Sequence, residues 1–199
     1  VIDMTAMLEM SITKKARLQS DLAAGLPAIQ ADVTQIRQVL MNLVTNASEA
    51  IGDRGGVITI RTGSGHCGEG DLRDTYFTED LPEGRYVFLD VADGGCGMTP
   101  EVRARIFDPF FTTKFAGRGL GLAAVLGIVR GHRGAIRVRS EAGRGTAIRI
   151  FFPASGERLR AETRRRCPLS AYSGLVVRMK QMGLVSERGS RLSNTSKVE

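Results

Sequence analysis

The stretch that decides the fold is VTQIRQVLMNLVTNASEAI, residues 33–51. Between Ile36 and Ile51 its apolar residues recur every three or four positions, which predicts a helix with one buried face. Asp32 stands just before the stretch and is a good N-cap, and Gly52 follows it as a stop signal. These local signals set both ends of the helix.

The opposite face of this predicted helix is polar in an unusual way. At the same helical spacing it carries Gln35, Gln38, Asn42, Asn46 and Glu49. Carboxamide oxygens are hard ligands that suit Mg²⁺, an ion that usually binds phosphate as well. An ordinary solvated face explains the same residues equally well. The helix alone therefore leaves both interpretations open.

Strand and helix patterns alternate around this helix. We expect strands at 16–22, 28–31, 57–61, 86–91, 135–139 and 146–152, and further helices at 2–13, from Thr99, and at 119–131. Residues 63–85 are polar and typical of a surface loop. The pattern ends after Pro153. The chain thus divides into N-terminal elements (1–31), an α/β body (32–153) and a basic tail expected to be disordered (154–199).

Charge and composition exclude several classes of protein. The net charge is +7, but the tail holds ten Lys/Arg against four Asp/Glu, so the body is nearly neutral. Nucleic acid is therefore not an expected partner, and only the tail keeps that alternative open. No apolar run approaches the roughly 20 residues that cross a bilayer. Three cysteines without CxxC spacing argue against a disulfide framework or a zinc cluster, and they fit a reducing, cytoplasmic setting.

Two glycine-rich segments follow the pattern of phosphate and base sites. DGGCGM (93–98) follows a strand, and its aspartate can accept a hydrogen bond from an amino group. GRGLGL (117–122) leads into a helix whose first N–H groups can face phosphate. A plain glycine-rich turn is the alternative for the first segment. No Gly-Lys-Ser/Thr occurs, which excludes a Walker A loop. A formal GxGxxG match at 63–68 lacks the helix that a dinucleotide site needs.

Between these two segments lies FDPFFTTK (107–114). Three phenylalanines and a proline between glycine hinges suggest a mobile cover that docks through its aromatic rings. Four cations in or beside it are placed to meet phosphate charge: Arg103, Arg105, Lys114 and Arg118. The alternative is a loop whose phenylalanines fill the edge of the core.

The order of these segments resembles the catalytic ATP-binding domain of sensor histidine kinases. Residues 42–47, 93–98, 107–114, 117–122 and 143–146 are similar, in order and spacing, to that family's N, G1, F, G2 and terminal Gly-Thr boxes. The resemblance spans roughly residues 34–153. It implies a two-layer α/β sandwich of the Bergerat type, in which helices cover one face of a mixed sheet. It also implies that ATP and Mg²⁺ bind between the helices and a lid at 98–118.

The resemblance also assigns roles to individual residues. Asn46 would coordinate the Mg²⁺ that bridges the phosphates, and Asp93 would accept a hydrogen bond from the adenine amino group. The residues implied to be catalytic are Asn42, Asn46 and Lys114. The implied nucleotide-binding set is Asn42, Asn46, Glu49, Ala50, Asp93, Gly95, Gly97, Met98, Phe107, Phe110, Lys114, Gly117, Arg118, Gly119, Leu120, Gly121, Leu122 and Thr146. Gly95 and Gly97 would let the base and ribose approach.

Two positions refine this resemblance. Asn42 stands where gyrase-like relatives carry a glutamate that activates water, and an asparagine instead fits transfer to an imidazole. Gly94 stands where the family usually has Thr, Asn or Ser, and it adds backbone freedom beside Asp93. The phenylalanine-rich segment also separates this chain from the related anti-sigma-factor serine kinases.

The phospho-acceptor histidine is expected outside this chain. His66 lies in a polar stretch and His132 at a helix end, and neither has the pattern of a helical hairpin. The resemblance implies a homodimeric parent kinase whose dimerisation and phospho-acceptor domain precedes residue 1, and a response-regulator receiver domain as partner. We predict a cytoplasmic kinase domain, with membrane anchoring of the parent left open. A non-catalytic nucleotide-sensing or scaffold module of the same superfamily is the alternative.

Overall fold

The structure is a computed structural model, and it describes residues 1, 4–68, 75–76, 81–114 and 118–155. Gly117 and the predicted tail from residue 156 onward lie outside the described residues. The described residues thus comprise the N-terminal elements and most of the α/β body.

In the described part of the chain, five strands form one mixed sheet in the order β1-β2-β3-β5-β4. They are β1 (Ala16–Leu22), β2 (Gly56–Cys67), β3 (Gly84–Asp93), β4 (Ala135–Glu141) and β5 (Gly145–Pro153). Among the described strands, β1 and β2 are the parallel pair and every other neighbouring pair is antiparallel. The pairing of β3 with β5 sets Asp93, the last residue of β3, opposite Thr146 near the start of β5.

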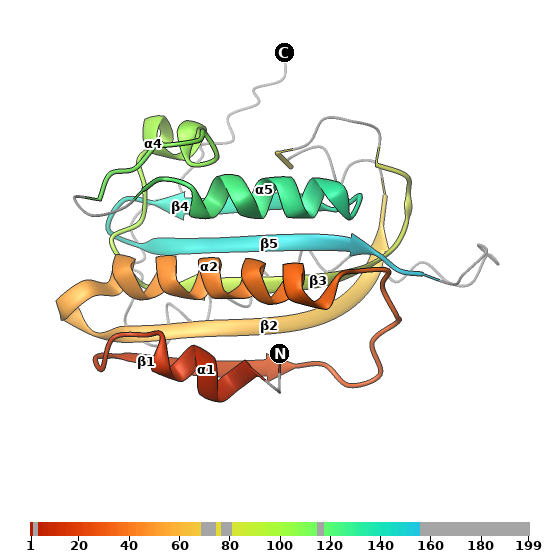
Figure 1. Cartoon of the computed structure of the whole chain (residues 1–199), viewed down its shortest axis with the longest axis horizontal. Coiled ribbons are helices and arrows are strands. Elements are labelled where there is room, and N and C mark those ends of the chain that lie inside the picture. The colour runs from red at the N-terminus through yellow and green to blue at the C-terminus, as the bar shows by residue number, and fades with distance from the viewer. Residues whose placement is uncertain (2–3, 69–74, 77–80, 115–117, 156–199) are drawn as a thin grey trace, which may run out of the picture. The chain divides into compact units, whose positions relative to one another are not determined.

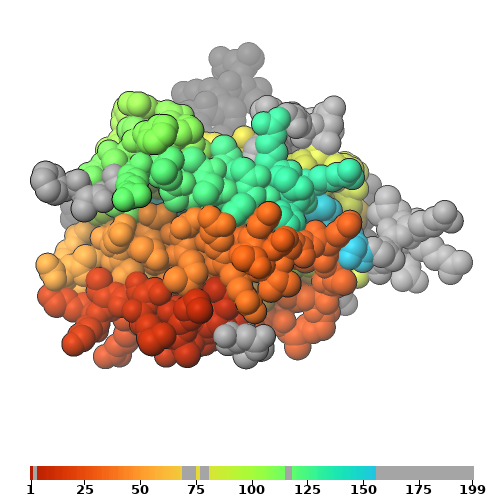
Figure 2. All heavy atoms as spheres, viewed as in Figure 1, coloured from red at the N-terminus to blue at the C-terminus, as the bar shows by residue number. Residues whose placement is uncertain are grey.

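The helices cover one face of this sheet (Figure 1). They are α1 (Thr5–Met10), α2 (Val33–Ile51), α4 (Pro100–Arg105) and α5 (Gly121–Gly131), with a short 3₁₀ turn η2 (Gly52–Arg54) after α2. In the space-filling view α5 lies directly against α2 (Figure 2). The predicted mixed-sheet, two-layer architecture is confirmed. None of the described helices combines the length and apolar character needed to span a bilayer.

Helix α2 begins and ends where its sequence predicts. The carboxylate of Asp32 accepts hydrogen bonds from the backbone N–H groups of Thr34 and Gln35, at 2.7 and 3.0 Å, and so caps the first turn. The apolar stripe of α2 faces the sheet, where its fully buried members include Val39, Leu40, Leu43 and Val44. Burying a side chain of this size contributes about 1.5–3 kcal/mol, which turns the polar face of α2 away from the sheet.

Some element boundaries predicted from the sequence are wrong. Strand β2 continues to Cys67, through part of the segment that we expected to be loop. Gly63 explains the difference, because it pairs with Phe88 and the phenyl ring occupies the space that a Cβ at Gly63 would need. The strand expected at 28–31 is also wrong, since only a single bridge joins Ile29 to Ala154.

The outer face of the sheet carries a row of charged side chains at one register. Across β1, β2, β3, β5 and β4 the row reads Asp21, Arg61, Asp90, Arg149 and Arg137. Arg61 Nε donates to Asp21 Oδ2 at 3.0 Å. Arg149 donates twice to the Asp90 carboxylate, each time at 2.5 Å, and both side chains are buried. The row is thus held by paired charges from neighbouring strands.

Candidate functional site

A pocket of about 510 Å³ opens between the polar face of α2, the start of α5, and the segments that follow β3 and α4. Most of the residues proposed from the sequence line it: Asn46, Glu49, Ala50, Asp93, Gly97, Met98, Lys114, Arg118, Gly119, Leu120, Gly121, Leu122 and Thr146. Four others do not: Asn42, Gly95, Phe107 and Phe110. Gly117 is not described.

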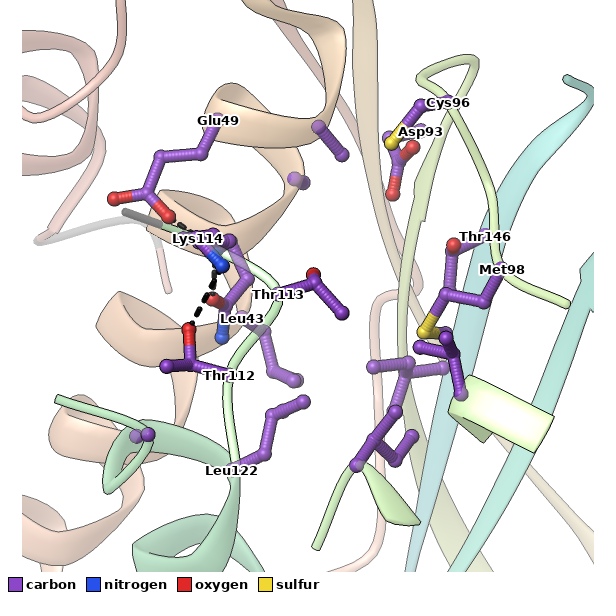
Figure 3. Close-up of a pocket in the computed structure, with 18 of the residues that line it drawn as sticks. Leu43, Glu49, Asp93, Cys96, Met98, Thr112, Thr113, Lys114, Leu122 and Thr146 are labelled. Atoms are coloured by element: carbon purple, nitrogen blue, oxygen red, sulfur yellow. Dashed lines mark hydrogen bonds and ion pairs between the residues drawn. The ribbon is translucent and has the colours of Figure 1, made fainter. Parts of the chain in front are cut away.

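The pocket has two opposite walls (Figure 3). The Asp93 wall consists of Asp93, Cys96, Met98 and Thr146. The Lys114 wall consists of Glu49, Thr112, Lys114 and Leu122, together with Asn46, which is bonded to Lys114. The two walls differ in chemistry, because the first presents a buried acid and the second presents an ammonium group bonded to a carboxamide and a carboxylate.

Asp93 is a buried hydrogen-bond acceptor at the end of β3. Its side chain is only 7% exposed, and its Oδ1 accepts a hydrogen bond from the Gly95 N–H at 2.8 Å. Burial raises the pKa of Asp93 to about 6, although backbone hydrogen bonds from Gly95 and Thr146 and the charge of Lys114 act in the opposite direction. At neutral pH the group is therefore mostly a carboxylate that accepts hydrogen bonds.

Two of the three glycines after Asp93, Gly95 and Gly97, are required by the protein's own backbone. A Cβ at Gly95 would lie 2.5 Å from the carbonyl carbon of Ala50 in α2. Gly97 has φ of +62°, and a Cβ there would overlap the carbonyl oxygen of Glu141. A Cβ at Gly94, in contrast, would meet nothing within 4 Å. Gly95 and Gly97 thus let the segment pack tightly against neighbouring backbone, which the sequence pattern alone does not reveal.

On the Lys114 wall an ammonium group already binds two oxygen-bearing side chains of α2. Lys114 Nζ donates to Asn46 Oδ1 at 2.7 Å and to the carboxylate of Glu49. The two acceptors stand one turn apart on the polar face of α2. Since they hold a cation here, their donor chemistry fits the Mg²⁺ that the sequence suggests. Among the described residues, no group of three His, Cys, Asp or Glu could hold a metal by itself.

Asn42 connects α2 to the start of α5. Its Nδ2 donates to the carbonyl oxygen of Gly121 at 3.2 Å. A Cβ at Gly121 would lie 3.7 Å from Asn42 Oδ1 and 3.8 Å from Asn46 Nδ2. An added methyl group would make only ordinary contacts here, so the close approach does not depend on glycine. The first turn of α5, with its free N–H groups, thus lies beside both carboxamides. Asn42 positions this helix end and does not itself line the pocket.

The three phenylalanines of the 107–114 segment take different positions. Phe107 is buried in the core, and its ring packs edge-on against Tyr76 with centroids 4.6 Å apart. Phe110 is 75% exposed, with a left-handed φ of +67°. Phe111 lines the pocket, with the guanidinium of Arg105 at 4.4 Å above its ring. Filling the core edge is thus the role of Phe107.

Sequence reasoning missed the apolar floor of the pocket. The lining residues that it did not propose are Leu43, Ala47, Val91, Cys96, Val102, Ile106, Phe111, Thr112, Thr113 and Ile148. Several of these belong to apolar stripes that point to the core, such as Leu43 on α2 and Ile148 on β5. The periodicity identifies them as buried, and only the three-dimensional arrangement shows that they also face the pocket.

Neither histidine lies in the pocket lining. His132 Nε2 accepts a hydrogen bond from the Asp32 N–H at 3.0 Å, and its Nδ1 lies 2.7 Å from the carbonyl oxygen of Ile128. This pairing assigns the proton of a neutral ring to Nδ1, so that His132 joins the end of α5 to the cap of α2. His66 is exposed on β2, opposite Arg85.

Comparison with known protein families gives a match over the α/β body. The family model described as "Histidine kinase-, DNA gyrase B-, and HSP90-like ATPase" matches residues 31–156. Sensor kinase CckA of Brucella abortus is 39% identical over 162 residues, which are 80% of this chain and 17% of that protein. Sensor histidine kinase ZraS of Klebsiella oxytoca is 41% identical over 129 residues, which are 65% of this chain and 24% of that protein. The chain thus spans about a fifth of the length of these relatives.

Solved structures give the same result. Full-length ShkA in complex with AMPPNP superposes with a TM-score of 0.58 at 27% identity, over 80% of this chain and 31% of that one. The catalytic domain of histidine kinase ThkA superposes with a TM-score of 0.55 at 27% identity, over 77% of this chain and 86% of that one. The chain therefore belongs to the histidine kinase-, DNA gyrase B- and HSP90-like ATPase family, and its fold is that of a histidine kinase catalytic domain.

Proposed function

We propose that this chain is the ATP-binding catalytic domain of a bacterial two-component sensor histidine kinase. It would transfer the γ-phosphoryl group of Mg-ATP to a histidine on a separate dimerisation and phospho-acceptor domain. One observation carries the proposal. The same pocket contains the buried carboxylate of Asp93 and, on its opposite wall, the side chains of Asn46 and Glu49, which bind the ammonium group of Lys114. The complex of ShkA with AMPPNP gives a relative in which a nucleotide analogue is bound.

The Asp93 wall suits adenine. An ionised Asp93 is an acceptor only, so it would pair with the amino group of adenine and repel the carbonyl oxygen that guanine carries at the same position. The apolar floor, which includes Leu43, Val91 and Ile148, would pack against the base and exclude water. Base selectivity therefore follows from one buried charge on an apolar surface.

The Lys114 wall suits the phosphates. Asn46 would hold Mg²⁺, with Glu49 beside it, and the ion when bound would supply positive charge between the phosphates. Lys114 and Arg118 would neutralise phosphate oxygens, and Gly121 and Leu122, the first residues of α5, line the same pocket, where their N–H groups would meet phosphate. A neutral imidazole is already nucleophilic, so this chain needs no general base. Its residues would act by positioning and charge neutralisation.

The proposed partners follow from this reaction. The acceptor histidine would belong to the dimerisation domain of a homodimeric parent kinase, and a response-regulator receiver domain would then take the phosphoryl group. The reaction would take place in the cytoplasm. These partners are proposed on the likeness to sensor kinases, since the chain spans about a fifth of their length.

Titration with a fluorescent ATP analogue and Mg²⁺ tests the binding step. Asp93→Asn should weaken binding about 10- to 100-fold, the loss expected for a hydrogen bond to a charged group. Asp53→Asn is the matched control, because Asp53 is an almost fully exposed acid that does not line the pocket. Unaltered binding in Asp93→Asn would rule out the adenine assignment.

Phosphotransfer is tested by adding a phospho-acceptor hairpin from a sensor kinase to the purified chain. Acid-labile phosphohistidine should form on the hairpin, and Asn46→Ala should abolish it. Nucleotide binding without transfer to any supplied hairpin would instead favour the alternative, a non-catalytic nucleotide-sensing module.

A further inference from the structure

The Lys114 wall contains a contact that the proposed reaction does not use. Lys114 Nζ is bonded both to Asn46 Oδ1, at 2.7 Å, and to the Glu49 carboxylate. Lys114 is separated from Asn46 by 68 positions in the chain, so the tertiary fold creates this contact. The side chains of Lys114 and Glu49 are 39% and 49% exposed, which leaves both free to move.

The ammonium group lies on the oxygen that is proposed to bind Mg²⁺. Two cations cannot share one carbonyl oxygen at bonding distance without strong repulsion, because unit charges a few ångströms apart interact by several kcal/mol near a protein surface. Lys114 must therefore leave Asn46 before a metal–nucleotide complex can use that oxygen. Its four-carbon stem allows it to turn toward the phosphates instead.

We infer that Glu49 is a positioning residue that holds Lys114 on Asn46 in the nucleotide-free site, so that Lys114 is an internal cation which Mg–nucleotide must displace. The inference rests on the proposed function of the pocket. A half-exposed ion pair is a weak hold. Glu49 thus lowers the affinity for nucleotide only modestly while it keeps a positive charge ready beside the phosphate site.

A double-mutant cycle measures this coupling. The variants are Glu49→Gln, Lys114→Met and the double variant, and the quantity measured is the Kd for a fluorescent ATP analogue with Mg²⁺. Glu49→Gln should tighten binding more in the presence of Lys114 than in the Lys114→Met background, by a factor of about two to five. Any gain that comes from removing a negative charge near the phosphates affects both backgrounds equally and cancels.

The matched control is the pair between Lys15 and Asp53, which joins Nζ to Oδ1 at 3.0 Å on the surface away from the pocket. Asp53→Asn should leave the Kd unchanged. Equal effects of Glu49→Gln in both backgrounds would overturn the inference, and so would weaker binding in the presence of Lys114, since Glu49 would then contact the metal or nucleotide directly. Failure of the unmodified chain to bind the analogue would instead remove the proposed function, and the inference with it.

Discussion

The two walls of the pocket are built by opposite means. The Asp93 wall contains a buried carboxylate and is fixed by backbone contacts that leave room only for glycine, as at Gly97 against Glu141. The Lys114 wall consists of half-exposed side chains that meet across a long separation in sequence. We expect the first wall to stay fixed when a ligand binds and the second to rearrange. The proposed base recognition and phosphate handling would then belong to parts of different stiffness.

Replacing Gly97 should produce the largest effect. Gly97→Ala places a Cβ on the carbonyl oxygen of Glu141 in a left-handed backbone conformation, so we expect a loss of about 3 kcal/mol or more in the free energy of unfolding, measured by urea denaturation. Gly94→Ala is the matched control, because the added methyl group meets nothing within 4 Å, and it should change the stability by less than about 0.5 kcal/mol. Similar small losses in both variants would contradict the rigidity of the Asp93 wall.

Asp93→Asn should stabilise the fold at pH 7.5, by about 1–3 kcal/mol. The folded pKa of Asp93 is about 6, above the ordinary value of 3.8, so the folded state disfavours the ionised group. Protonation of Asp93 therefore stabilises the folded wild-type protein as the pH falls through 6 toward 3.8. Above pH 6 this stabilising contribution is lost. The asparagine can still accept the Gly95 N–H bond.

Unfolding curves at several pH values check this sign. The advantage of Asp93→Asn should shrink as the pH falls and vanish near pH 4. An advantage that stays constant with pH would show that the burial of the charge is not its source. The same variant should lose nucleotide affinity, so that function and stability oppose each other at this wall.

Lys114→Met should change the stability by less than about 1 kcal/mol, because its ion pair with Glu49 is half-exposed. Its Kd for the ATP analogue should nevertheless rise several-fold through the loss of a phosphate contact. Thermal melts and analogue titrations of the same samples separate these two effects. A large loss of stability would mean that the Lys114 wall is as rigid as its counterpart.

Phe110→Ala should have the smallest effect, because this ring is 75% exposed and lies outside the pocket lining. We expect a change in stability below about 0.5 kcal/mol and a Kd for the analogue within about two-fold of the wild-type value. Phe111→Ala is the matched comparison, since Phe111 does line the pocket and should bind the analogue more weakly. A strong effect at Phe110 alone would show that the 107–114 segment moves onto the nucleotide.

Local signals predict the central helix of this fold well. Helix α2 has the expected bounds, because Asp32 and Gly52 are local start and stop signals. Strand β2 is longer than expected because the glycine at position 63, which resembles a loop residue, is there for the ring of Phe88. A glycine that serves a packed neighbour and a glycine that serves a turn look the same in a sequence.

The candidate site was predicted only in part for the same reason. Spacing places Asn46 on the polar face of α2, a strand followed by glycines draws attention to Asp93, and the family resemblance gives both a role; the two residues lie in one pocket. It does not show that Lys114 reaches Asn46, or that Gly95 packs on Ala50, because both contacts depend on the tertiary fold. The sequence likewise does not show that Phe110 lies at the surface, because nothing in the pattern distinguishes the three phenylalanines of its segment.

The charged row on the outer face of the sheet also bears on how the strands find their alignment. Side chains alternate between the two faces, so a slip of β5 by one residue would turn Arg149 toward the apolar core. There it would be a buried charge without Asp90, which costs several kcal/mol. The correct alignment alone lets Asp90 bond to Arg149 twice. The charged row therefore favours one strand register: it adds little net stability to the correct sheet, but it makes sheets with a shifted register unstable.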